Sequence, residues 1–171
     1  MKRTEISTLD YNSYYQNYID LVADVPLLDA LENGHPITEA FFENLPSLKW
    51  TYRYQENKWT PKDILQHIID TERVFCYRAL YFARTEMISL EGFDENIFAA
   101  NANADSKSPE TLFEEYRTVR AATIALFKGF DDIQLKKRGV ANNNIMSVAA
   151  AGFIICGHDI HHRNIIKERY L

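Results

Sequence analysis

Two helix starts are unusually well marked in this sequence and restrict the fold more than any other feature. In "WTPKDILQHIIDTE", Thr60 is expected to be the N-cap, with Pro61 at the first helical position. Ser108 and Pro109 repeat this signal at the start of "SPETLFEEYRTVR". Apolar residues then recur at spacings of three and four, which is the period of one helix face. The sequence therefore predicts two long helices, each with one buried face.

The residues of these two buried faces can be listed from the spacing. On the first helix they are Ile64, Ile68, Phe75, Ala79 and Phe82. On the second they are Leu112, Tyr116, Val119, Ile124 and Phe127. A stripe of this width is typical of a helix that packs against neighbours on one side.

Two further helical regions flank this pair. The first extends from about Tyr11 to Leu45, with interruptions near "DVP" and "NGHP", because Pro26 and Pro36 each restrict the residue before them. A short helix followed by a longer, kinked one is favoured over a single rod. We place His35 in a loop at the second interruption. The last region extends from about Met146 to Tyr170 and ends in "KERYL", whose cations suit a helix C-terminus.

No strand alternation and no Asn-Gly hairpin signal competes with the helical period. Between the second and third helical regions lies "MISLEGFDENIFAANANADSK", a connection long enough to suggest a functional role. We therefore predict an all-α protein, a four-helix bundle with a long crossover between helices two and three. Residues 1–171 are expected to form a single domain.

Charge and composition exclude several classes of partner. The net charge is -5, and no basic run exceeds "LKKRG", so nucleic-acid binding is not expected. No apolar stretch is long enough to span a membrane, and "MKRTEISTLDYNSYYQ" lacks the apolar segment of a signal peptide. The two cysteines, Cys76 and Cys156, lie in apolar surroundings and are read as buried thiols. A cytoplasmic location is therefore expected.

Three of the five histidines lie in "GHDIHHRNII". Along the last helix, Val148, Ala151, Ile155, His158, His162 and Ile165 follow the spacing of one face. His158 and His162 are one turn apart, so both rings project from that face and can reach one ion. His161 is offset from this face and is expected at the rim.

His67 also lies on an inward-leaning face, three residues after Ile64. Facing helices of a bundle approach within about 10 Å, so His67 can complete a three-histidine site with His158 and His162. Neutral imidazoles suit Zn, Ni, Cu or Fe, and three protein ligands is the pattern of catalytic sites. The alternative is that these are hydrogen-bonded core histidines without a metal. Metal release is expected as the pH falls below about 6.5.

Several charged residues near this candidate site have two interpretations each. Asp70 is either an acceptor for a ligand imidazole or an ordinary polar flank, and the polar flank is favoured. Glu72, Arg73 and Arg78 form either a network between helices or exposed ion pairs, which are commoner. Asp94 in "GFDEN" either orders the long connection near the site or caps a helix. No strong general base flanks the histidines, and catalytic residues are left unassigned.

Together, "WTPKDILQHIIDTE", "GFDEN" and "GHDIHHRNIIKERYL" resemble the DinB-like four-helix bundle superfamily, which includes the YfiT-like proteins. The resemblance extends from about Tyr11 to the C-terminus. His67, His158 and His162 match the metal triad of that family. The resemblance thus implies a divalent transition metal, with Zn or Ni expected ahead of Fe or Mn.

The function that the resemblance implies is less uniform than the fold. We expect a metal-dependent enzyme of the thiol-dependent S-transferase or isomerase type, acting on small electrophiles with a low-molecular-weight thiol. The alternatives are a metal-dependent hydrolase and a non-enzymatic, dimeric, stress-associated binding protein. A homodimer is expected because the family often pairs through its helices, and Tyr77, Tyr81 and Phe82 are candidates for the apolar contact surface.

Overall fold

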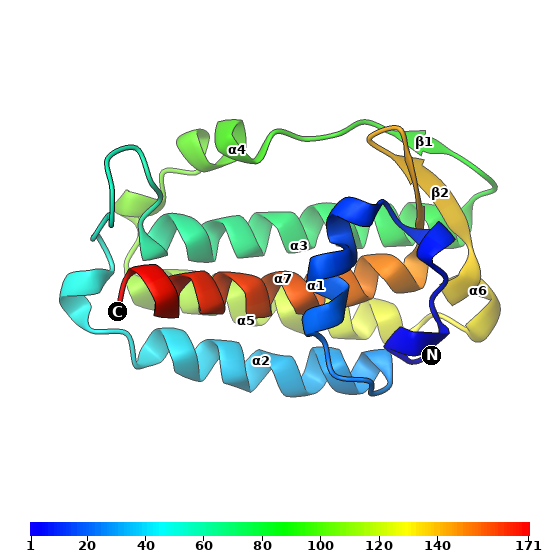
Figure 1. The fold of residues 1–171 in the computed structure, drawn as a ribbon, viewed down its shortest axis with the longest axis horizontal. Coiled ribbons are helices and arrows are strands. Elements are labelled where there is room, and N and C mark those ends of the chain that lie inside the picture. Colours follow the sequence, from blue (N-terminus) through cyan, green and yellow to red (C-terminus); the bar gives the residue numbers. More distant parts are fainter.

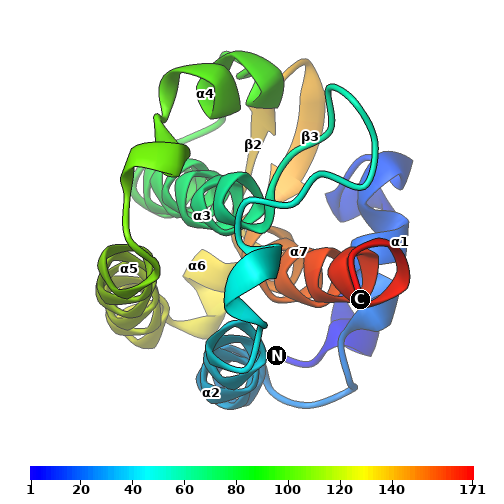
Figure 2. The same ribbon diagram turned by 90° about the vertical axis from the view of Figure 1, so that its left-hand side faces the viewer.

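Four long helices lie side by side in the computed structural model, which describes residues 1–171 (Figure 1, Figure 2). They are α2 (Leu27–Glu43), α3 (Pro61–Arg84), α5 (Pro109–Lys128) and α7 (Val148–Arg169). The predicted four-helix bundle is therefore confirmed. None of the helices combines the length and apolar composition that a membrane crossing requires.

Shorter elements connect the long helices. Three more α-helices are present: α1 (Gln16–Leu21), α4 (Glu95–Asn101) and α6 (Asp132–Lys136). Single turns of 3₁₀-helix occupy Arg3–Glu5, Thr8–Asp10, Ser13–Tyr15, Ser47–Lys49 and Ala104–Ser106.

The two marked helix starts form as predicted. The Thr60 hydroxyl accepts a hydrogen bond from the Asp63 amide at 3.1 Å, and the Asp63 carboxylate accepts one from the Thr60 amide at 2.8 Å. This capping box satisfies two amides that the helix leaves without partners. The Ser108 hydroxyl caps α5 in the same way through the Thr111 amide, at 3.2 Å. The predicted apolar stripes of both helices are buried, apart from Ile124, which is half-buried.

The predicted interruption near "NGHP" is wrong, whereas the one near "DVP" is correct. Helix α1 ends before Pro26, but α2 continues through Pro36 without a break. His35 is therefore helical rather than in a loop, and its Nε2 lies 3.8 Å from the Glu39 carboxylate. A proline inside a helix removes one amide donor, and the packing of α2 against α5 and α7 compensates for that loss.

A small three-stranded sheet closes one end of the bundle, although the sequence predicted no strands. It consists of β1 (Ser89–Leu90), β2 (Arg138–Ala141) and β3 (Asn144–Ser147), with β1 parallel to β2 and β2 antiparallel to β3. The hairpin turn places Asn142 and Asn143 at φ values of 50° and 59°. Asparagine tolerates this left-handed region, so the turn forms from "NNN" without the Asn-Gly pair that usually marks a hairpin in a sequence.

The long crossover between α3 and α5 is confirmed and contains β1, α4 and the 3₁₀ turn Ala104–Ser106. It passes along the outside of α3, as Figure 1 shows. The Asp94 carboxylate accepts hydrogen bonds from the amides of Asn96, at 2.8 Å, and Ile97, at 3.0 Å. Asp94 is thus a helix cap, and this cap fixes where the residues of α4 lie along the bundle.

The apolar core has two parts, and the three candidate ligands lie between them on α3 and α7. Helix α1 packs directly against α7 at this level, because Gly157 has no side chain. A Cβ atom at Gly157 would lie 1.9 Å from the carbonyl oxygen of Tyr18. This close approach brings the Tyr18 ring to 5.7 Å from the ring of His158.

Candidate metal centre

Three histidine side chains converge from two helices at the centre of the bundle. His67 Nε2, on α3, lies 3.0 Å from His158 Nε2, on α7, and His162 Nε2 lies 2.9 Å from the same atom. All three ligand atoms lie within 4.8 Å of one another. The structure thus brings together the three residues that the sequence singled out as metal ligands.

Burial keeps these three imidazoles neutral at ordinary pH. It lowers the pKa of His67 to about 4, and His161 adds a smaller effect in the same direction. The pKa values of His158 and His162 are well below 6.5, again mainly because burial disfavours the charged ring. Since only a neutral imidazole can donate its lone pair to a metal, the three rings are in the protonation state that ligation requires.

The contacts among the three rings fit a cation better than a hydrogen-bond network. His158 Nε2 faces the Nε2 atoms of both His67 and His162, and one ring nitrogen offers only one proton or one lone pair. One of the two contacts is therefore unsatisfied in any combination of neutral tautomers. Zinc–nitrogen bonds of about 2.0–2.1 Å separate the ligands of a tetrahedral ion by about 3.3 Å. The two shortest spacings are within a few tenths of an ångström of this value.

The groups around the triad are mostly uncharged. The Thr71 hydroxyl lies 3.4 Å from His67 Nδ1, and the ring of Trp59 lies 4.7 Å from the ring of His67. His162 Nδ1 is buried without a hydrogen-bond partner. Asp70 accepts hydrogen bonds from the side chains of Gln66 and Arg73 instead of a ligand ring. Asp70 is therefore an ordinary polar residue beside the site, which is the interpretation that the sequence favoured.

His161 lies outside the group formed by His67, His158 and His162, although its ring centroid is 5.0 Å from that of His162. Its ring packs against Tyr18, with the ring centroids 5.0 Å apart, and it is not part of the converging group. It lines a second, smaller cavity of about 320 Å³ together with Tyr54, Trp59 and the outer side of His162. The structure therefore places His161 at the rim.

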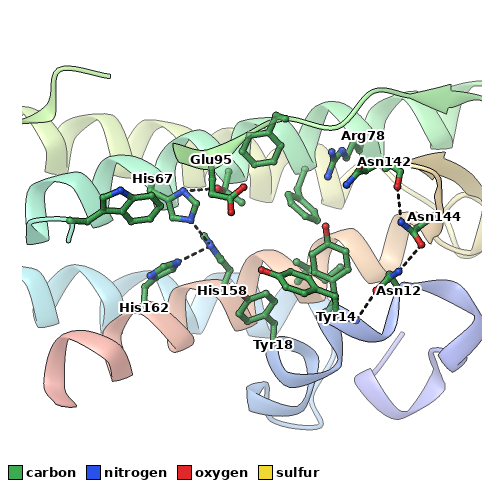
Figure 3. A pocket seen from close by; sticks show the side chains of 17 residues that line it. Asn12, Tyr14, Tyr18, His67, Arg78, Glu95, Asn142, Asn144, His158 and His162 are labelled. Atoms are coloured by element: carbon green, nitrogen blue, oxygen red, sulfur yellow. Dashed lines mark hydrogen bonds between the residues drawn. The ribbon is translucent and has the colours of Figure 1, made fainter. Parts of the chain in front are cut away.

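The triad forms one end of a cavity of about 520 Å³ (Figure 3). Trp59 lies at the same end as the histidines, and the far end holds Arg78 together with Asn142. The Glu95 side chain, from α4, is exposed and lines the same cavity. The cavity thus combines three converging imidazoles with one carboxylate and one guanidinium.

The sequence did not identify Glu95 as part of this site. Its only signal is its position in "GFDEN", directly after the residue that caps α4. Acidic residues are common in the first turn of any helix, so the pattern alone does not separate a site residue from a surface residue. Only the path of the crossover brings this carboxylate to the cavity.

Glu72, Arg73 and Arg78, also on α3, have different roles. Glu72 is 2 % exposed and accepts two hydrogen bonds of 2.8 Å from Arg120, a partner that the sequence did not predict. Arg73 pairs at the surface with Glu115, at 2.7 Å. Arg78 is 3 % exposed and faces the cavity. Glu72 and Arg73 thus each form an ion pair with α5, one buried and one at the surface, whereas Arg78 pairs with no carboxylate.

Neither cysteine can supply a nucleophile at neutral pH. Burial raises the pKa of both Cys76 and Cys156 to about 12. Cys76 contacts the Thr123 hydroxyl at 3.1 Å, and Cys156 lies in the core. The prediction of a buried thiol is correct for Cys156, whereas Cys76 is half-buried.

Comparisons with known proteins agree with this architecture. The family model of the DinB superfamily matches residues 30–166. The fold is similar to that of YfiT from Bacillus subtilis, with a TM-score of 0.74, 17% sequence identity, and 83% of this chain and 82% of YfiT covered. YfiT is described as a probable metal-dependent hydrolase with an unusual four-helix bundle topology.

A second similar structure is YjoA, a DinB-like protein also from Bacillus subtilis. It has a TM-score of 0.60 and 13% identity, with 84% of this chain and 89% of YjoA covered. No curated protein matches the sequence.

Proposed function

The chain belongs to the DinB superfamily, and from this premise we propose that it is a metal-dependent hydrolase of small molecules. The observation that carries the proposal is the meeting of three neutral imidazoles and the Glu95 carboxylate in one cavity. The similarity to YfiT, described as a probable metal-dependent hydrolase, supports the same class.

His67, His158 and His162 would hold the ion, and Zn or Ni is the expected metal because neutral imidazole suits both. A divalent metal with three protein ligands supplies a Lewis acid that lowers the pKa of a nucleophile and polarises the bond under attack. The surrounding aromatic rings of Tyr18 and Trp59 limit the access of bulk water to this end of the cavity.

Glu95 is proposed to accept the proton of the attacking nucleophile and to pass it to the leaving group. A positioned general base of this kind contributes about 10²–10⁴-fold to a rate. Its side chain lines the same cavity as the triad, on an element anchored by the Asp94 cap. Glu95 therefore supplies the candidate general base that the sequence analysis did not find near the histidines.

Transfer of a low-molecular-weight thiol is the second candidate function. One observation favours it: the cavity of about 520 Å³ has room for a thiol and an electrophile together. Neither Cys76, which is half-buried, nor Cys156, which is buried, lines the cavity, so the sulfur would come from a separate small molecule. The same three histidines and Glu95 would serve this reaction.

The experiment that separates these candidates starts from protein purified without an affinity tag or added metal. Elemental analysis gives the metal content, and a panel of esters and amides is then assayed with and without added thiols. Turnover in water alone supports the hydrolase, whereas turnover that requires a thiol supports the transferase. Bound metal with no turnover on either panel would instead support a binding protein.

A further inference from the structure

Two arginines are almost completely buried in this bundle, and only one of them is neutralised. Arg120 is fully buried, and its guanidinium lies 2.8 Å from the carboxylates of both Glu72 and Asp159. Arg78 is 3 % exposed, yet no carboxylate lies within 4.0 Å of it. Buried charges in proteins are normally paired, because removal of a cation from water costs several kcal/mol.

Arg78 is held with its guanidinium between two aromatic rings. It lies 5.0 Å from the ring centre of Phe75 and 5.7 Å from that of Phe93. Stacking of this kind fixes the plane of the guanidinium, and the neutral Tyr15 side chain is the hydrogen-bonding neighbour of its N–H edge. Figure 3 shows this edge at the far end of the cavity from the histidines. The guanidinium therefore lines the cavity with a neutral hydroxyl as its neighbour, and no carboxylate balances its charge.

Asparagine side chains surround the same end of the cavity. Asn12 Nδ2 donates to Asn144 Oδ1 at 2.6 Å, and Asn144 Nδ2 donates to the backbone carbonyl of Asn142 at 2.6 Å. Asn142 follows the last residue of β2 and also lines the cavity. These amides are neutral, so they add hydrogen-bonding capacity without neutralising Arg78.

The spacing along α3 connects this end of the cavity to the triad. Eleven residues separate His67 from Arg78, which is about 16 Å along the axis and three turns, with an offset of only about 20°. Thr71 and Phe75 lie between them on the same face and also line the cavity. Long side chains on a helix lean toward its N-terminus, so Arg78 reaches back toward the histidines.

We propose that Arg78, with Asn12 and Asn144, binds a carboxylate of the substrate while the reactive group of the same molecule lies at the histidine triad. This inference deepens the proposed function and rests on it for the position of the reactive end. A single guanidinium with amide neighbours matches the single charge and planar shape of a carboxylate. A phosphate carries up to two charges and would be met by one cation only. The substrate class is a small, elongated carboxylic acid whose reactive bond is remote from the carboxylate.

The test measures binding rather than turnover. Zinc-loaded protein is titrated calorimetrically with ω-mercaptocarboxylic acids of increasing chain length and with their methyl esters. The thiol provides a metal ligand in both probes, so only the charge at the other end differs. We expect one chain length at which the acid binds at least about tenfold more tightly than its ester, the size of one charge-assisted hydrogen bond.

Arg78→Met is expected to abolish the preference for the acid and to leave the metal content unchanged. Arg73→Met is the matched control, since Arg73 lies on the same helix but points to the surface, where it pairs with Glu115. This control should retain the preference in full. Should Arg78→Met fail to fold, the comparison of acid with ester on the unaltered protein still decides the question.

Three results would overturn the inference. Equal binding of acid and ester by the unaltered protein would show that no anion site exists. Retention of the preference in Arg78→Met would place the site elsewhere. Tighter binding of the matching mercaptoalkyl phosphate by about tenfold would show that the class of anion is wrong.

The metal and the anion site can fail separately in this design. If the protein holds no metal, the proposed function is wrong. The carboxylate site is then tested in metal-free protein with thiol-free carboxylic acids and their methyl esters. A preference for the acid that depends on Arg78 would support the site without the metal, and its absence would overturn the site as well.

Discussion

His67 Nε2 and His158 Nε2 lie 3.0 Å apart, although 91 residues separate them in the chain. The two atoms meet because α3 and α7 pack closely along their length, and each helix presents its histidine on the shared face. Burial keeps both rings neutral, so the contact carries no charge repulsion at neutral pH. It places two lone pairs where one cation can satisfy both.

Replacement of any one triad histidine is expected to remove the metal. In His67→Ala, His158→Ala or His162→Ala, two ligands remain, and metal affinity should fall by more than the roughly 10–100-fold typical of residues that only support a ligand. His161→Ala should keep a near-normal metal content, because its ring packs against Tyr18 outside the converging group. Elemental analysis after dialysis checks this pattern. Metal loss in His161→Ala alone would contradict the assignment of the ligands.

The stability of metal-free protein is expected to decrease as the pH falls from about 6.5 to about 4. In the folded protein the pKa of His67 is about 4, whereas in the unfolded chain it is near 6.5. Between these values the unfolded chain binds a proton that the folded protein does not, so acid favours unfolding. His67 alone contributes at most about 3 kcal/mol. Urea denaturation at a series of pH values measures the effect, and His67→Ala should show a flatter dependence.

The same pKa shifts revise the pH at which metal is released. Protons compete with the metal only when the free imidazole can bind them. Burial lowers the pKa of all three histidines, so they bind protons only at lower pH. Release is therefore expected below pH 6.5, toward pH 4, rather than at the ordinary histidine value. Metal content measured after equilibration at each pH tests this prediction, and release complete by pH 6 would refute it.

Glu95→Gln is expected to reduce turnover about 10²–10⁴-fold, because the amide cannot accept the proton of the nucleophile. Metal content should not change, since Glu95 is not one of the three converging ligands. Glu91→Gln is a suitable control, because Glu91 is an exposed acid on the same crossover and does not line the cavity. Equal rates in both variants would exclude Glu95 as the proton acceptor.

Arg120→Met is expected to destabilise the bundle by about 3–5 kcal/mol. The substitution leaves the buried carboxylates of Glu72 and Asp159 without their cation. Arg78→Met, by contrast, leaves no carboxylate unpaired and should cost little stability. Chemical denaturation of the two variants side by side provides the measurement. Similar losses in both would contradict the distinction between the two buried arginines.

The homodimer remains a proposal, and the structure alters its proposed contact surface. Phe82 is fully buried in the core, whereas Tyr77 is 52 % exposed and stacks on Tyr81 at the surface of α3. Light scattering at micromolar concentration should give the mass of two chains. Tyr77→Glu should shift that mass toward one chain, whereas a monomer in the unaltered protein would contradict the proposal.

Local signals in the sequence were sufficient to predict the capped helices and to place His158 and His162 on one helix face. Thr60 and Ser108 form their caps with atoms only three residues away, so neighbouring residues suffice to predict them. The spacing of His158 and His162 likewise follows from the geometry of one helix. The helix break predicted at Pro36 is absent, because the packing of α2 against two other helices outweighs the loss of one hydrogen bond.

By itself, then, the sequence determined the bundle, the boundaries of its capped helices and the three converging histidines. Only the tertiary structure brought Glu95 to the cavity and left Arg78 buried without a carboxylate partner. Helical spacing specifies which residues of one helix share a face, because that relationship depends on a few consecutive residues. The path of the long crossover and the choice of partner for each buried charge depend on contacts between distant segments, which no local pattern encodes.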